Sequence, residues 1–218
     1  MKQAAQRMLG TVVIRRMLAL AFAWLVMTAA SLAHAYDPAL SQEEIERLER
    51  GEVVTHPDTL KQDGRRWIGG VSFAIIDAPP SEVGDVLENV DNYREILPRV
   101  RELRWIAISR AGDAIVELEQ GTSLAHGRYT IGIRREREPH GAEMVRFWID
   151  GRFRRDIADA RGWFRLEPIP GDRTLISYVI MIDLGPGLFK RLFEDKIRNS
   201  ALRPPLLVRR YFDNRAGR

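Results

Sequence analysis

Cysteine is absent from the 218-residue sequence, which excludes disulfides, thiol catalysis and metal sites with cysteine ligands. Histidine is scarce, with four in the chain. His56, His126 and His140 each lie in a Gly- or Pro-containing turn, and none has a partner at the spacing of a metal-binding motif such as His-Glu-x-x-His. We therefore expect all three to be exposed turn residues, and we expect no metal and no cofactor.

Other catalytic patterns are missing as well. Gly69-Gly70 precedes a predicted strand rather than a helix, so it does not form a phosphate-binding loop. Glu117 and Glu119 lie on one face of a predicted strand, as paired catalytic carboxylates can. The other face carries Val116 and Leu118, and the apolar face is the one expected to turn inward. The sequence predicts solvent-facing glutamates and no catalytic residue.

Outside its first 35 residues, the sequence has no excess of one charge. The net charge of +4 arises from 34 basic and 30 acidic residues. Four of the basic residues lie in that first stretch, which contains no acidic residue, so 30 of each sign remain in the rest of the chain. A neutral remainder gives no support for nucleic-acid binding.

The first 35 residues have the three parts of a secretory signal peptide. A basic stretch ends at Arg15-Arg16, residues 17–32 are apolar, and Ala33-His34-Ala35 supplies the small-x-small pattern that signal peptidase recognises. We predict cleavage before Tyr36 and export, with the mature protein in the periplasm. The alternative is an uncleaved membrane anchor, but the apolar run is at the short end for spanning a bilayer of roughly 30 Å.

Residues 36–66 predict a short helix followed by a linker. Ser41 and Glu44 form a capping-box pattern, and a sparse apolar stripe continues until Gly51, which can end the helix. Residues 55–64 contain two turn-like sequences. We expect this segment to pack along the outside of the main domain.

Residues 67–218 show the pattern of an α+β domain. A predicted strand at 69–77 is followed by a helix with apolar residues on one face, and then by a second short helix that Pro98 ends. Short strands at regular spacing then predict an antiparallel meander. These strands cover residues 100–109, 113–122, 128–137, 144–150, 162–168 and 173–184.

The chain then becomes helical. Apolar residues recur at i, i+3 and i+4 on an otherwise charged helix, and Pro204-Pro205 must kink or restart it, because an interior proline removes a backbone donor. A last helical turn or two follows. The apolar stripe consists of Leu188, Phe189, Leu192, Phe193 and Ile197. A curved antiparallel sheet wrapped around this long C-terminal helix, with two short helices after the first strand, is a helix-grip fold.

The segment 71–100, VSFAIIDAPPSEVGDVLENVDNYREILPRV, resembles the opening of the START-like, or polyketide cyclase/dehydrase (SRPBCC), superfamily. The matching features are Asp77-Ala78-Pro79 at the end of a strand, Val-x-x-Val-Leu at 83–87, and Asp-x-Tyr-x-x-x-Leu-Pro at 91–98. The sequence departs from the family at Gly84, where many relatives have a bulky residue, so looser packing is expected there.

The resemblance covers residues 68–212 and implies a hydrophobic molecule held between the sheet and the C-terminal helix. Within the superfamily, which also includes carriers, hydroxyl-ligand sensors and cyclases, the chain is similar to coenzyme-Q-binding START-domain proteins. The implied partner is a lipid, a quinone or a similar small molecule. Periodicity assigns the apolar wall of the site to Tyr129, Ile131, Phe147, Trp163 and Tyr178, and the helical lid to Leu188, Leu192, Phe193 and Ile197.

The function favoured by these observations is a noncatalytic carrier in the cell envelope. A cyclase- or aromatase-like enzyme would need a titratable cluster inside the site. An envelope interaction module would use the same apolar residues to fill its core. The charged residues at 134–138 and the arginines at 152, 154 and 155 indicate solvated edges, or a weak contact with an anionic membrane surface. The sequence makes no prediction about oligomeric state.

Overall fold

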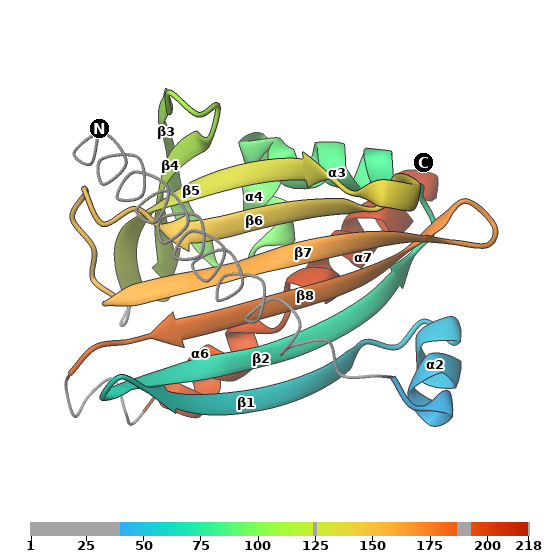
Figure 1. The fold of residues 1–218 in the computed structure, drawn as a ribbon, viewed down its shortest axis with the longest axis horizontal. Coiled ribbons are helices and arrows are strands. Elements are labelled where there is room, and N and C mark those ends of the chain that lie inside the picture. Colours follow the sequence, from blue (N-terminus) through green and yellow to red (C-terminus); the bar gives the residue numbers. More distant parts are fainter. Residues whose placement is uncertain (1–39, 124–125, 187–192, 218) are drawn as a thin grey trace, which may run out of the picture. The chain divides into compact units, whose positions relative to one another are not determined.

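One antiparallel β-sheet, with most of the helices on one of its faces, organises the described part of the chain (Figure 1). The computed structural model describes residues 40–123, 126–186 and 193–217. Eight strands lie in the order β1-β2-β8-β7-β6-β5-β4-β3. They are β1 (Val54–Gln62), β2 (Arg65–Ile76), β3 (Val100–Ile108), β4 (Ala114–Gly121), β5 (His126–Arg137), β6 (Glu143–Ile149), β7 (Asp159–Ile169) and β8 (Arg173–Asp183).

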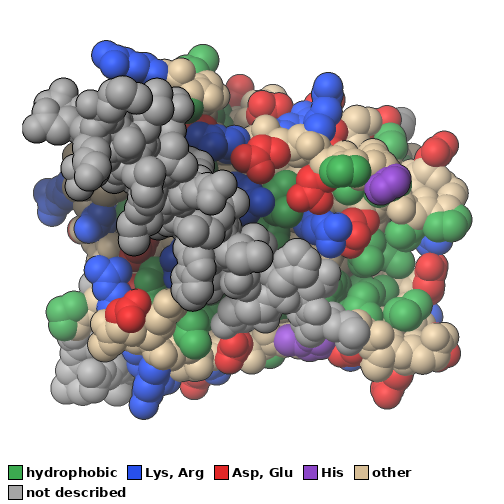
Figure 2. All heavy atoms as spheres, in the orientation of Figure 1, with side chains coloured by type: hydrophobic (Ala, Val, Ile, Leu, Met, Phe, Trp, Pro, Cys, Tyr) green, Lys and Arg blue, Asp and Glu red, His purple; other side chains and the backbone are tan. Residues whose placement is uncertain are grey.

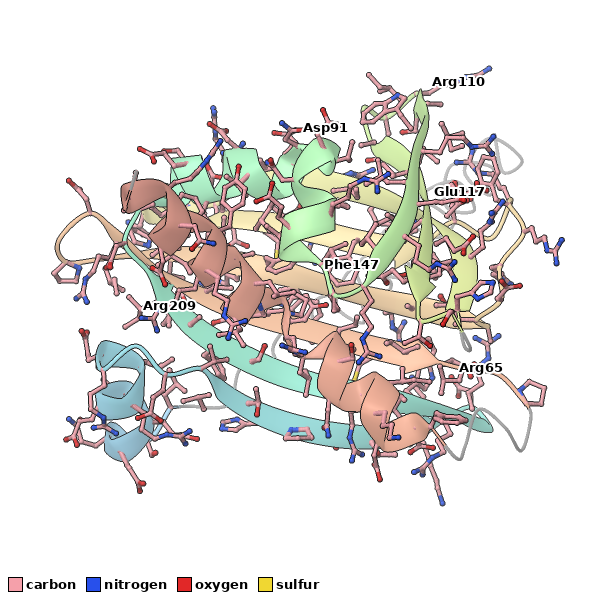
Figure 3. All side chains as sticks on the ribbon, turned by 180° about the vertical axis from the view of Figure 1, so that it is seen from behind. Arg65, Asp91, Arg110, Glu117, Phe147 and Arg209 are labelled. Carbon is pink, nitrogen blue, oxygen red and sulfur yellow. The ribbon has the colours of Figure 1, made fainter. Side chains whose placement is uncertain are left out.

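The helices follow the predicted order along the chain. They are α2 (Gln42–Glu49), α3 (Pro80–Glu88), α4 (Tyr93–Ile96), α6 (Glu194–Ala201) and α7 (Pro204–Ala216), with short 3-10 turns η1 (Val90–Asn92) and η2 (Pro139–Gly141). The meander returns to β2 through β8, and α4, α6 and α7 lie in front of the sheet in Figure 3. The predicted helix-grip α+β fold is therefore confirmed. None of the described helices is long and apolar enough to span a membrane.

Strand β1 corrects the prediction of a linker at residues 55–64. The segment pairs with β2 along its whole length. Pro57 does not prevent this pairing, because β1 is an edge strand and needs backbone donors on one side only. Asp63 and Gly64 have positive φ angles of 52° and 72°, as a two-residue hairpin turn requires. The turn-like sequences therefore belong to a hairpin.

Alternate residues of the strands form the core between the sheet and the helices. In β5, Ile131 and Ile133 belong to this core. Thr130 and Gly132 alternate with them along the strand and point to the other face. Burial of each large apolar side chain contributes about 1.5–3 kcal/mol. Core side chains that are almost fully buried include Ile68, Ile76, Leu87, Ile96, Leu118, Leu166 and Ile176.

The C-terminal helix is interrupted, as the proline pair predicted. Helix α6 ends at Ala201, and α7 begins at Pro204. The first residue of a helix has no acceptor within the helix for its backbone amide, so proline loses no helical hydrogen bond at this position. Between the two helices, the Ser72 hydroxyl of β2 donates a 2.9 Å hydrogen bond to the carbonyl of Leu202. Helix α7 has 13 residues, which is longer than the predicted turn or two. The junction is thus attached to β2 by a buried hydrogen bond.

Helix α2 begins with the predicted capping box of Ser41 and Glu44. The other carboxylate oxygen of Glu44 lies 2.6 Å from His56 Nε2, and the His56 ring packs edge-on against Phe73 with centroids 5.8 Å apart. His56 is therefore a half-buried strand residue, and the prediction of an exposed turn residue was wrong. The Ser41 amide, together with His56, lowers the pKa of Glu44 to about 2.

The predicted looser packing at Gly84 is wrong. Arg135 of β5 extends under α3 at this position, and a Cβ on Gly84 would lie only 2.6 Å from its guanidinium carbon. The guanidinium donates to Glu143 at 2.7 Å, to Asp85 at 2.6 Å and to Glu88 at 3.1 Å. Its side chain is 12% exposed, so Arg135 is not part of the solvated edge that we expected at residues 134–138.

Charged side chains of both signs occupy the opposite face of the sheet near β3, β4 and β5. Glu117 lies 3.2 Å from Arg104, and Glu119 lies 2.9 Å from Arg128. Figure 2 views this face and shows acidic and basic side chains interspersed over its described part. The two glutamates lie on the face away from the core, as predicted, and each is paired with an arginine. The prediction that both face solvent is wrong for Glu119, which is 9% exposed because arginine side chains cover it.

Candidate functional site

Four of the five sheet residues predicted for the ligand wall lie on one face of the sheet. Tyr129, Ile131, Phe147 and Tyr178 belong to the core cluster or pack against it. We call this the grip face, because it is the face that α4, α6 and α7 cover (Figure 3, where Phe147 is labelled). The structure therefore brings these four residues together.

Trp163 lies on the other face. Phe164 of β7 is paired in register with Tyr178 of β8 on the grip face, and successive residues of a strand point to opposite sides. Phe164 therefore takes the position that we predicted for Trp163. A signal for this was present in the sequence, because Arg165 and Glu167 alternate in phase with Trp163, and charged residues favour the solvent side.

Three aromatic rings form the centre of the grip face. The ring centroids of Phe147 and Tyr178 are 5.9 Å apart, those of Phe164 and Tyr178 are 4.4 Å apart, and those of Phe147 and Phe164 are 6.0 Å apart. Gly162 lies against the Phe147 ring, where any Cβ would clash with it. These three residues, the aromatic cluster, have spacings typical of favourable ring pairs. Phe147 is only partly buried, so part of the cluster is accessible.

Helix α6 supplies the described part of the helical lid. Ile197 packs against the core cluster. Phe193, immediately before the helix, is half-buried, and Lys196 Nζ lies 5.8 Å from its ring centroid. The other two predicted lid residues, Leu188 and Leu192, lie outside the described residues.

Two tyrosine hydroxyls add polar groups to the grip face. Tyr129 donates to the side-chain oxygen of Gln120, whose amide donates to the carbonyl of Pro98 at 3.0 Å. Tyr178 is 3% exposed, and its hydroxyl has no hydrogen-bond partner among the residues that the structure describes. Burial raises the pKa of both tyrosines, so both hydroxyls stay neutral at pH 7. The Tyr178 hydroxyl oxygen is not among the fully buried atoms that lack a partner, so it is accessible and free to bind a ligand or a water molecule.

The arrangement is suited to binding rather than to acid–base chemistry. Among the described residues, Glu143 is the buried carboxylate on the grip face. It lies 2.7 Å from the Arg135 guanidinium. His126 and His140 are exposed, as predicted. Within the described ranges, no three His, Asp or Glu side chains lie close enough together to hold a metal ion.

No protein-family model and no curated protein matches this sequence. Among solved structures, the chain is similar to a STAR-related lipid transfer protein (fragment 25-204) from Xanthomonas axonopodis, with a TM-score of 0.60 and 15% identity over 74% of this chain and 98% of that one. It is also similar to the lipid transfer and protein localization domain of human StarD13, with a TM-score of 0.55 and 12% identity over 80% of this chain and 98% of that one.

A third similar structure is the Zhui aromatase/cyclase from Streptomyces sp. R1128, with a TM-score of 0.53 and 14% identity over 74% of this chain and 96% of that one. At identities this low, the similarity is one of fold and leaves the ligand and the chemistry open. The chain has the START-like helix-grip fold.

Proposed function

We propose that this protein is exported and acts as a noncatalytic binding or carrier protein for a hydrophobic ligand in the cell envelope. The ligand lies on the grip face, against the aromatic cluster and under α6. The observation that carries this proposal is the Tyr178 hydroxyl, which lies beside two aromatic rings, is accessible and has no partner among the described residues. A ligand with an apolar body and one polar group would cover the accessible part of Phe147 and hydrogen-bond to Tyr178.

Two further observations support the proposal. The names of two similar structures, those from Xanthomonas axonopodis and human StarD13, describe lipid transfer. Residues 1–35 have the pattern of a cleavable export signal. A lipid and a quinone both combine an apolar body with a polar end, and the resemblance to coenzyme-Q-binding proteins adds the quinone to the ligands worth testing.

Native mass spectrometry tests the proposal directly. Protein expressed from the full sequence is purified from the periplasm and sprayed without denaturation, and bound molecules are extracted into organic solvent. We expect a chain beginning at Tyr36 that carries a reproducible added mass of a lipid or quinone. A chain that stays free of ligand after incubation with a panel of lipids and quinones would contradict the binding function. A chain that remains with the membranes and keeps its leader would contradict cleavage.

The variant Tyr178→Phe tests whether the Tyr178 hydroxyl binds the ligand. The variant keeps the ring and removes the hydroxyl, so we expect ligand affinity to fall about two- to tenfold, the worth of one hydrogen bond, with no loss of folding stability. The contrasting variant is Tyr93→Phe, because the buried Tyr93 hydroxyl donates to the carbonyl of Leu87 at 3.0 Å. That variant should lose stability and keep its affinity. A Tyr178→Phe protein with full affinity would show that its hydroxyl does not contact the ligand.

A further inference from the structure

A hollow of about 260 Å³ lies at the rim of the grip face, where the loop between α4 and β3 approaches α6 and the residue before α7. Figure 3 shows α6 and α7 on the same side of the sheet as Phe147. The hollow is lined by Arg99, Lys196, Asn199, Ser200 and Arg203. Three of these five side chains are positively charged, although their apolar stems form most of the hollow's surface and the charged ends lie around its opening. We call the feature the cationic hollow.

Among the described residues, the three cations have no carboxylate to neutralise them. No acidic oxygen of the described residues lies within 4.0 Å of Arg99, Lys196 or Arg203. The nearest acids along α6 are engaged elsewhere, because Glu194 pairs with an arginine of β2 at 2.6 Å and Asp195 pairs with an arginine of α6 at 2.7 Å. Like charges that share one hollow repel each other, and a bound anion would relieve that repulsion.

Arg99 is held in a strained backbone conformation. Its φ of 57° lies in the left-handed region that favours glycine. The Gln120 side chain donates to the carbonyl of Pro98, and the amide of Gly121 donates to the carbonyl of Arg99 at 3.0 Å, so neighbouring bonds fix the loop. Strain of this kind is typical of functional positions. Gln120 also accepts the Tyr129 hydroxyl, so a short hydrogen-bonded path connects the hollow with the grip face.

Arg203 is positioned by the junction between α6 and α7. Leu202, the preceding residue, is 3% exposed, and its carbonyl accepts the hydrogen bond from Ser72 of β2. The amide of Arg203 donates to the carbonyl of Ser200 at 3.2 Å. On the same helix, Ile197 packs against the core cluster. The α6 wall of the hollow therefore borders the apolar site, and its cations are presented from an anchored backbone.

We propose that the cationic hollow binds the anionic head group of an amphiphile, a carboxylate or a phosphate, while the apolar chain of that molecule lies on the grip face. This inference rests on the proposed function, because the chain needs the aromatic cluster. Guanidinium and ammonium groups form strong, charge-assisted hydrogen bonds with such oxygens, and Asn199 and Ser200 add neutral donors. The ligand class is then an anionic lipid or fatty acid rather than a neutral quinone.

Chain-matched ligand pairs test this inference. Protein expressed from the full sequence and stripped of lipid is titrated with oleate and oleyl alcohol, and with dioleoyl phosphatidic acid and dioleoylglycerol. We expect the anionic member of each pair to bind at least about tenfold more tightly, as charge-assisted bonds imply. The double variant Lys196→Glu/Arg203→Glu should abolish this preference, because it should weaken the two anionic ligands at least about tenfold more than the two neutral ones.

A charge-matched control separates the hollow from net charge. Arg110→Glu/Arg154→Glu changes the net charge by the same amount at exposed arginines outside the hollow, and it should keep the preference for anionic ligands. Equal affinity within both pairs would overturn the inference and leave the proposed function standing. Failure of all four ligands to bind would overturn both. Inorganic phosphate that binds as tightly as phosphatidic acid would show a site for free anions, which also overturns the inference.

Discussion

At Gly84, the absent side chain leaves room under α3 for the guanidinium of Arg135 and the carboxylate of Glu143. The ion pair has a side-chain exposure of only 12% on the arginine and 7% on the glutamate. A buried pair of this kind is tolerated because each charge is compensated, and displacement of one partner leaves the other uncompensated. One glycine thus determines that a charged residue can lie between a helix and the sheet.

We predict that Gly84→Val lowers the free energy of unfolding by about 1–3 kcal/mol, because the new side chain must displace Arg135. Urea unfolding followed by circular dichroism measures the change. Glu82→Val is the matched control: it places the same side chain at an exposed position of the same helix, and a change within about 0.5 kcal/mol is expected. Equal destabilisation by the two substitutions would contradict a specific role for the displacement of Arg135, since valine is a better helix former than glycine.

The residue-level predictions failed where a spatial neighbour decides the environment. Trp163 and Phe164 are adjacent aromatic residues, so a shift of one position in strand phase exchanges their faces. Arg135 is buried because Gly84, about fifty positions earlier in the chain, has no side chain. No local sequence pattern around Arg135 reveals this. His56 is half-buried because Glu44 reaches it from another element. Strand alternation, in contrast, correctly placed Tyr129, Ile131, Phe147 and Tyr178 on one face.

Among the elements, the junction between the two C-terminal helices is attached to the sheet by one buried hydroxyl. The Ser72 side chain reaches the carbonyl of Leu202, which the ending of α6 leaves without a helical donor. Because Pro204 cannot continue the helix, this carbonyl depends on a partner from outside. The position of α6 over the grip face therefore depends on β2 as well as on packing.

We predict that Ser72→Ala destabilises the fold by about 1–3 kcal/mol, because the buried carbonyl of Leu202 loses its donor. Hydrogen exchange should show the largest loss of protection in α6 and at the start of α7. The control is Ser177→Ala in the adjacent strand, whose hydroxyl has no hydrogen bond within the described ranges. Unchanged exchange in α6 in the Ser72→Ala protein would contradict the proposed anchoring role.

Most elements follow from periodicity and turn residues. All six strands of the meander, the two short helices and the restart at Pro204 agree with the sequence prediction to within a few residues. Strand β1 was missed because His56, Pro57 and Asp58 form a turn-like sequence, and only the free edge of β2 makes them a strand. The lid segment at 187–192 lies outside the described residues, so that part of the site remains a prediction.

On the scale of the whole molecule, ion pairs between arginines and carboxylates are distributed over the surface. Arginine hydrogen bonds are the first cause of a lowered pKa at Glu49, Glu52, Asp113, Glu119 and Asp150, and the Ser41 amide is the first cause at Glu44. A carboxyl group with a lowered pKa binds its proton less readily in the folded chain than in the unfolded chain. Its contribution to stability is therefore complete above the unfolded value and is lost on acidification.

We predict that the melting temperature is nearly constant down to about pH 5 and then falls continuously. The fall should begin near the ordinary carboxyl values of 3.8 and 4.5 and extend to about pH 2, the folded pKa of Glu44. Thermal unfolding between pH 2 and pH 7 measures this. Glu44→Gln should make the fall between pH 4.5 and pH 2 smaller, because it removes the group that titrates lowest. A melting temperature that rises on acidification would contradict the sign of the prediction.

Within the described residues, the sheet ends in two edge strands, β1 and β3, and both are irregular. Register shifts interrupt β3 between Val100 and Glu102 and between Trp105 and Ala107, and Pro57 interrupts the outer side of β1. Bulges and proline make an edge a poor template for another strand. The described edges therefore disfavour the extension of the sheet from one copy of this protein to the next.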